Sequence, residues 1–231
     1  MSVLNLSEEN PYSAYIIPEI YRIKLYEMMM EIMKEFTKFD LHFFLDGGSA
    51  LAVARGGQII LHDDDVDIGT YEVNPELADL SIGNNYQLLY NKVKLILQNI
   101  AERTSYRVQD VGELLKLFVP NMYGITKELP KRVIGTPTID FFLYTKHKKH
   151  YKLHPKEFSK KWPDSKYETS DLVEYKTFKF TESLQLQCPV VKNLEKYMDN
   201  QYPDWRTVYE IEIRDNTNHK LEKIKMKIPF I

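Results

Sequence analysis

The chain has 231 residues, of which 43% are hydrophobic and 28% are charged, an ordinary composition for a globular protein. Its formal net charge of -2 argues against a protein whose main task is to coat nucleic acid, so no DNA partner is expected. The single cysteine, Cys188, excludes a disulfide framework and a cysteine-rich zinc site. The N-terminus lacks the basic start and apolar core of a secretory signal, and no window approaches the ~20 apolar residues of a transmembrane segment. We therefore expect a cytoplasmic protein.

Hydrophobic spacing, turn residues and helix-ending prolines define the predicted elements. In chain order they are a helix over 18–38, a strand over 41–45, a helix over 49–55, a strand over 65–70, a helix over 85–103, strands over 106–111, 114–119, 138–144, 176–180 and 183–188, and a helix over 191–200. Ser49 is the predicted N-cap of the second helix. The order lacks a steady βαβ alternation, which favours an α+β fold with a mixed β-sheet flanked by helices.

The predicted domain organisation is simple. Residues 1–17 are expected to be a loosely attached lead-in, and residues 18–231 a single domain. The Lys- and Pro-rich stretch 146–170 is expected to be irregular.

Four aspartates lie within five positions, from Asp63 to Asp67, and two of them alternate with apolar residues. On a strand, residues two apart project to the same face, so Asp65 and Asp67 project together while Val66 and Ile68 enter the core. Two carboxylates this close repel each other, and a bound divalent cation is the simplest compensation. Oxygen-only ligands favour Mg²⁺ or Mn²⁺ over zinc.

Asp140 is the natural third ligand. It lies in the apolar run TIDFFL, where Ile139 and Phe141 share the opposite face, and a carboxylate inside such a strand is costly unless it is paired or bound to metal. Three carboxylates from neighbouring strands could hold one or two ions, and a pair of ions would clamp both oxygens of a phosphoryl transfer.

Three other interpretations of these aspartates are possible. An acidic run is often a solvated loop, although the interleaved Val66 and Ile68 weaken that interpretation. An EF-hand loop starting at Asp63 would need Gly at 68 and Glu at 74, where the chain has Ile68 and Asn74. Asp140 could instead belong to a buried hydrogen-bonded pair of structural importance.

Gly47, Gly48 and Ser49 follow a predicted strand and precede a predicted helix. Glycines there let a phosphate approach the backbone, and a helix N-terminus supplies amide donors. Such a turn alone is a weak signal, and it gains force because the acidic strand follows closely in sequence.

The stretch GGSALAVARGGQIILHDDDVDIG resembles the LicD family, which includes fukutin and fukutin-related protein. The family hallmark is roughly GGTLLGAVR, a short loop and PWDDDIDI, and the spacing from the glycine pair to the aspartates matches it without a gap. Leu61 and His62 depart from the family's proline and tryptophan. A weaker likeness covers FTESLQLQCPVVKNLEKYMDNQYPDW.

The resemblance implies a nucleotidyltransferase fold and a chemistry. Asp65 and Asp67 would be the metal-binding pair and Asp140 the third carboxylate, which would also help to deprotonate an acceptor hydroxyl. The enzyme would move a phosphorylated alcohol, such as phosphocholine or ribitol phosphate, from a CDP-activated small-molecule donor to a glycan acceptor.

The resemblance also implies substrate contacts. Gly47, Gly48 and Ser49 would contact the donor phosphate. Arg55 falls on the family arginine and would either neutralise phosphate charge or pair with one of the aspartates. Two alternatives stay open: a nucleotidyltransferase that adds a nucleoside monophosphate to protein, RNA or a small molecule, and an inactive binding module on the same fold.

The remaining features carry weaker signals. In KHKKHYKLHPKEFSKK, residues 146–161, three histidines would share one face of a helix, but the nearby Pro155 and the lack of cysteine do not favour zinc. A solvated loop, or an electropositive rim for an anionic donor or a phosphorylated glycan, fits better. Four aromatic side chains could form stacking surfaces for sugar rings, but such residues more often belong to the core: Trp162, Trp205, Tyr202 and Tyr209. Cys188 is expected to be a packed, inert thiol.

Overall fold

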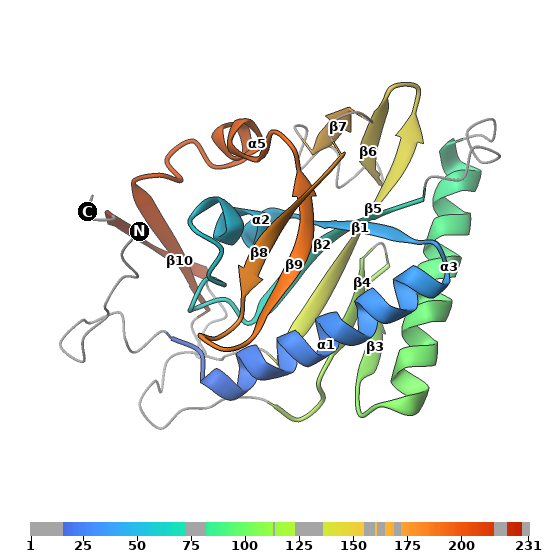
Figure 1. Ribbon diagram of the computed structural model, residues 1–231, viewed down its shortest axis with the longest axis horizontal. Coiled ribbons are helices and arrows are strands. Elements are labelled where there is room, and N and C mark those ends of the chain that lie inside the picture. The colour runs from blue at the N-terminus through green and yellow to red at the C-terminus, as the bar shows by residue number, and fades with distance from the viewer. Residues whose placement is uncertain are drawn as a thin grey trace.

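The computed structural model describes residues 16–72, 82–112, 114–122, 136–154, 160, 165–168, 172–214 and 221–227. Helices and strands alternate irregularly along the chain (Figure 1). The elements are α1 (Glu19–Lys38), β1 (His42–Leu45), α2 (Gly47–Ala54), β2 (Asp65–Tyr71), α3 (Ile82–Arg103), β3 (Arg107–Asp110), β4 (Leu115–Phe118), β5 (Thr138–His147), β6 (His150–His154), β7 (Lys166–Glu168), β8 (Leu172–Lys179), β9 (Gln185–Val191), α5 (Leu194–Gln201), β10 (Val208–Arg214) and β11 (Leu221–Lys227).

A seven-stranded mixed sheet organises the molecule, which confirms the predicted α+β class. Its main path runs β1-β2-β5-β4-β3, with β6 and β7 continuing from β5. Strands β2 and β5 pair in parallel, and the other pairs of this sheet are antiparallel. Two hairpins, β8–β9 and β10–β11, form separate two-stranded sheets. The parallel pair places the start of β2 beside the start of β5, with Asp65 opposite Thr138.

Helices α1 and α3 cover one side of this sheet. Both contact β5 and each other, and Figure 1 shows α1 crossing in front of the strands with α3 along their right-hand edge. The spacing that predicted α1 produces this packing, because Leu25, Met28 and Ile32 lie on one face and are fully buried. Within the described residues, no helix is both long and apolar enough to cross a membrane.

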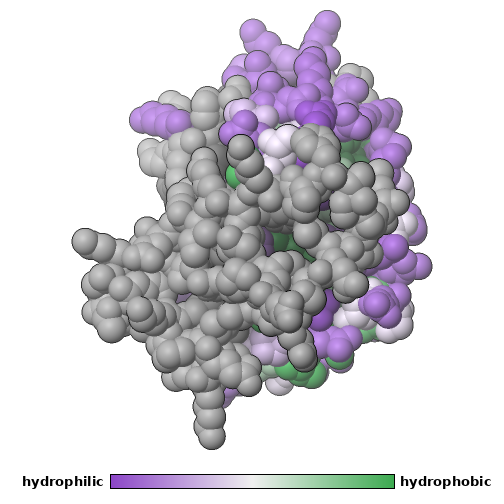
Figure 2. Space-filling view, turned by 90° about the vertical axis from the view of Figure 1, so that its left-hand side faces the viewer, coloured by the Kyte–Doolittle hydropathy of each residue, from purple (hydrophilic) through white to green (hydrophobic). Residues whose placement is uncertain are grey.

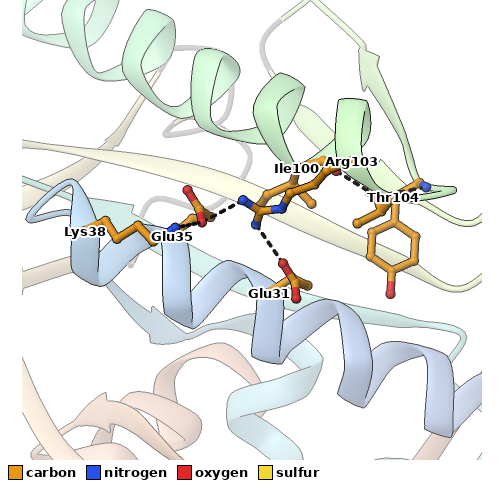
Figure 3. Close-up of polar contacts among 7 residues, drawn as sticks. Glu31, Glu35, Lys38, Ile100, Arg103 and Thr104 are labelled. Atoms are coloured by element: carbon orange, nitrogen blue, oxygen red, sulfur yellow. Dashed lines mark hydrogen bonds and ion pairs between the residues drawn. The ribbon is translucent and has the colours of Figure 1, made fainter.

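An ion-pair cluster joins α1 to α3 (Figure 3). Arg103 donates to Glu35 at 2.8 Å and to Glu31 at 2.7 Å, and Lys38 donates to Glu35 at 2.5 Å. Glu35 is only 3% exposed. The hydrogen bond from Lys38, followed by that from Arg103, holds the pKa of Glu35 below its usual range against the opposing effect of burial. The cluster fixes the relative position of the two helices.

We expect Arg103→Gln to lower the free energy of unfolding by about 1–3 kcal/mol, because the buried carboxylate of Glu35 loses one of its two charged donors. Since the folded-state pKa of Glu35 is depressed, its contribution is present above the unfolded-state value of about 4.3 and is lost as the pH falls through the folded-state value. Chemical denaturation at neutral and acidic pH measures both effects. Arg206→Gln is the control, because Arg206 pairs with exposed Glu195 and Asp199, and its loss should cost under about 1 kcal/mol. Equal losses in the two variants would contradict the assignment.

Two local predictions are wrong. Helix α2 begins at Gly47, and its N-cap is Asp46, whose side chain accepts a hydrogen bond from the Gly47 amide at 2.9 Å, so Ser49 is not the cap. The stretch 146–170 is not irregular throughout: β5 continues to His147, turns, and returns as β6, which pairs with β7. Alternating burial along β6, with Tyr151 and Leu153 inside, stabilises this hairpin despite its lysines.

The expected strand pair near the C-terminus is confirmed and longer than predicted, as β8 and β9. Strands β10 and β11 were not predicted. Of the expected lead-in, residues 1–15 lie outside the described part of the chain. Ile17 is 1% exposed, and its amide donates to the Leu61 carbonyl at 2.8 Å.

Candidate metal and phosphate site

Three carboxylates meet where β2 and β5 run side by side. Asp67 and Asp140 are direct register partners on these parallel strands, and Asp65 lies two residues before Asp67 on the same face. One oxygen from each of Asp65, Asp67 and Asp140 lies within 4.8 Å of the others. Val66 and Ile68 are fully buried on the opposite face, as the alternation predicted. Among the described residues, this is the one group of three acidic, His or Cys side chains close enough to share an ion.

The chemistry of these oxygens fits a divalent cation. Asp140 is 5% exposed, and its Oδ2 accepts from Lys116 Nζ at 2.6 Å. Its other oxygen, Oδ1, is buried and has no hydrogen-bond partner among the described residues. A buried carboxylate oxygen without a partner is costly, and a cation would remove that cost. Asp65, Asp67 and Asp140 are therefore the residues that could hold Mg²⁺ or Mn²⁺.

The electrostatics of the cluster support this fit. Burial is the main cause that raises the pKa of Asp65 and Asp67 well above the ordinary range, and the neighbouring carboxylates raise both further. Burial also raises the pKa of Asp140, and the ammonium of Lys116 opposes that shift. The raised pKa values of the three aspartates show that their negative charges are poorly solvated and close together. A bound divalent ion would neutralise that charge.

The glycine turn interlocks with Asp67. Gly48 donates its amide to Asp67 Oδ2 at 3.0 Å, and the Asp67 amide donates to Ser49 Oγ, also at 3.0 Å. Gly47 has φ +47°, and a Cβ added there would lie 2.5 Å from Asp67 Oδ2. Only glycine allows both this backbone conformation and this approach. The turn thus lies directly against Asp67, one of the three carboxylates of the candidate site.

Asp46, which the sequence did not single out as a site residue, holds the same turn in place. Its buried carboxylate accepts hydroxyl hydrogens from Tyr144 at 2.6 Å, Tyr167 at 3.0 Å and Tyr197 at 2.6 Å, in addition to the Gly47 amide. Its own amide donates to the Asp67 carbonyl at 3.1 Å. These tyrosines come from β5, β7 and α5, so one residue ties three distant elements to the turn. An Asp directly before the first helical residue was the available signal.

Arg55 connects α2 to the segment after α5. It donates from Nε to the Trp205 carbonyl at 3.0 Å and from Nη2 to the Val208 carbonyl at 2.6 Å. Its contact with phosphate stays a prediction. Helix α5 buries Leu194 and Met198 and exposes Glu195, Lys196 and Asp199. The upper part of the side of the molecule shown in Figure 2 is largely hydrophilic.

Tyr202, at the C-terminal end of α5, is half-buried near the acidic cluster. Its pKa is raised by burial and by the charges of Asp67 and Asp46. Trp205 is 7% exposed and therefore belongs to the core, as expected, whereas Trp162 lies outside the described residues.

The other sequence candidates lie elsewhere. His147 and His150 are register partners across the β5–β6 turn, and His154 ends β6, so these histidines do not share a helical face. Cys188 is fully buried, as predicted, and burial raises the pKa of its thiol to about 12.

Divalent-metal binding should depend steeply on pH. Because the pKa values of all three carboxyl groups are raised, protons compete with the ion at pH values above the ordinary aspartate pKa of about 3.9. We expect Mn²⁺ at about 100 times its dissociation constant to stabilise the protein by about 2.7 kcal/mol, and affinity to fall on acidification. Calorimetric titration across pH measures this. An affinity that does not change as the pH is lowered would contradict the assignment.

Comparison with known families adds to this geometry. A family model described as "LicD/FKTN/FKRP, nucleotidyltransferase domain" matches residues 40–225, which is most of the chain and includes every residue of the site. The match extends beyond the region of visible resemblance, into β11. A search of curated proteins found no match to this chain.

Proposed function

The chain belongs to the LicD/FKTN/FKRP family, and from this premise we propose that it transfers a phosphorylated alcohol from a CDP-activated donor to a glycan hydroxyl. Family membership indicates a transferase of the phosphotransferase type that modifies glycans. The observation that carries the finer proposal is the convergence of Asp65, Asp67 and Asp140 beside the Gly47–Gly48 turn. A divalent cation would bind the oxygens of a diphosphate, and the two neighbouring glycines, which lack Cβ atoms, would let the diphosphate approach the backbone closely.

In this proposal, Asp65, Asp67 and Asp140 hold Mg²⁺ or Mn²⁺. The ion would supply Lewis-acid stabilisation of the donor diphosphate and of the departing CMP. Asp140 would also receive the proton of the acceptor hydroxyl, whose oxygen forms the new bond to phosphorus as the bond to CMP breaks.

The turn residues would admit and orient the donor. Gly47 and Gly48 already donate their amides to Asp46 and Asp67, so their part is to let a phosphate approach closely. Ser49 Oγ accepts from the Asp67 amide, which leaves its own hydrogen to donate to a phosphate oxygen. Arg55 would add positive charge at the end of α2.

A thermal-shift panel tests the proposal. CDP-choline, CDP-ribitol, CDP-glycerol, ATP and UTP are each compared with and without Mn²⁺, with Asp67→Asn as the matched control. Stabilisation by CDP compounds that requires both the metal and Asp67 is the expected result. A preference for ATP or UTP would favour nucleotidyl transfer, and no response to any compound would favour a binding module; both outcomes contradict the proposal.

A further inference from the structure

Lys116 is a charged side chain of the site that neither the motif nor the proposed roles use. It lies on β4, directly opposite Asp140 in the antiparallel β4–β5 register. Its neighbours Leu115 and Leu117 are fully buried on the other face of β4, so the strand alternation directs Lys116 to the same face as Asp140. The position follows from sheet topology rather than from a side chain that happens to lie nearby.

The contact itself is close and incompletely buried. Lys116 Nζ donates to Asp140 Oδ2 at 2.6 Å, and the lysine side chain is 28% exposed while that of Asp140 is 8% exposed. The ammonium therefore lies between the buried carboxylate and solvent. An ammonium has three hydrogens to donate, and the contact with Asp140 uses one of them.

The two oxygens of Asp140 have different surroundings. Oδ2 carries the ammonium, whereas Oδ1 is buried without a hydrogen-bond partner among the described residues. An ion bound to Oδ1 would lie on the other side of the same carboxylate group from the Lys116 ammonium. Two cations at that short separation repel each other. A polyanion that bridges them would remove the repulsion, and a diphosphate is the group with the oxygens and charge to do so.

From this geometry we propose that Lys116 binds the donor diphosphate, so that the substrate is held jointly by this lysine and by the ion on Asp65, Asp67 and Asp140. The inference rests on the proposed function for the identity of the ion and of the substrate class. It assigns Lys116 two opposite effects: the ammonium opposes binding of a bare divalent ion and strengthens binding of a diphosphate once the ion is present.

The opposite signs make the experiment decisive. Mn²⁺ affinity is measured by calorimetry, and then inorganic pyrophosphate affinity is measured in saturating Mn²⁺, for the wild type and for Lys116→Met. We expect Lys116→Met to bind Mn²⁺ about tenfold more tightly, because a Coulomb repulsion is removed. We expect its affinity for pyrophosphate to fall about 10- to 100-fold, the range for loss of one hydrogen bond to a charged group.

Two further variants guard against trivial causes. Lys116→Arg keeps the charge and should keep most of the pyrophosphate affinity. Lys152→Met, on β6 of the same sheet, should change neither affinity. A lysine that only supports Asp140 would weaken both affinities when it is replaced, and a lysine without a role would change neither; either result overturns the proposal, as does tighter Mn²⁺ binding with unchanged pyrophosphate binding.

Failure of the proposed function would look different. A wild-type protein that binds Mn²⁺ and pyrophosphate but no CDP compound would contradict the CDP donor, while the signs seen in Lys116→Met would still decide the role of the lysine. A wild-type protein that binds no Mn²⁺ would overturn both proposals.

Discussion

Asp67→Asn is expected to abolish turnover and, in the absence of metal, to raise the melting temperature. Loss of a metal ligand removes several kcal/mol of transition-state stabilisation, so activity should fall by about 10³-fold or more. The asparagine oxygen can still accept the Gly48 amide, which preserves the turn.

The expected gain in stability follows from the sign of the pKa shift. The pKa of Asp67 is raised in the folded state, first by burial and then by the charge of Asp140. A carboxyl group whose folded-state pKa exceeds its unfolded-state value destabilises the fold increasingly as the pH rises above the unfolded-state value, and the cost is complete above the folded-state pKa. Asparagine carries no charge, so the substitution removes the cost.

The matched control is Asp110→Asn on β3. Asp110 accepts from Lys94 at 2.8 Å, and that contact lowers its pKa, so its neutralisation should lower the melting temperature slightly and leave turnover unchanged. Differential scanning calorimetry of the metal-free proteins and a turnover assay measure the pair. Retained activity in Asp67→Asn would remove the metal assignment, and a lower melting temperature would show that Asp67 is not repelled by its neighbours.

Gly47→Ala is the second substitution with a large expected effect. A methyl group there would lie 2.5 Å from Asp67 Oδ2, on a backbone with φ +47°, so the turn and the carboxylate cannot both keep their positions. We expect a destabilisation of about 1–3 kcal/mol from the strained backbone. We also expect about a 100-fold loss of turnover, because small displacements in a catalytic site are costly.

Gly112→Ala separates strain from contact. Gly112 also has a positive φ, +80°, but a Cβ added there meets no atom of the described residues within 4 Å. Gly112→Ala should therefore lose a similar amount of stability, because its backbone is strained in the same way, and should keep both turnover and Mn²⁺ affinity. If the two alanine variants had the same activity, the close approach of the turn to Asp67 would have no functional importance.

Much of the site was predictable because its signals are local. Period-two alternation in DVDIG and TIDFF was enough to orient Asp65, Asp67 and Asp140, and the glycine pair marked the turn. The motif spacing then indicated the family, which the match over residues 40–225 confirms.

The missing parts depend on pairings that the sequence does not display. Lys116 lies 24 positions before Asp140, and only the antiparallel β4–β5 register brings them together. The tyrosines on Asp46 come from three elements up to 151 positions away. Ser49 and Asp46 both fit the role of helix cap by residue type, and the structure has Asp46, which directly follows the last residue of β1.

The parallel pairing of β2 with β5 also determines when the site can come into existence during biosynthesis. Residues 65–70 pair with residues 138–143, so Asp65 and Asp67 are synthesised about 70 residues before Asp140. At roughly 5–20 residues per second, translation separates them by roughly 4–15 s, and contacts this distant along a chain form late in folding. An ion held jointly by Asp65, Asp67 and Asp140 would therefore bind only after β5 has left the ribosome, which would make metal loading a late step of maturation.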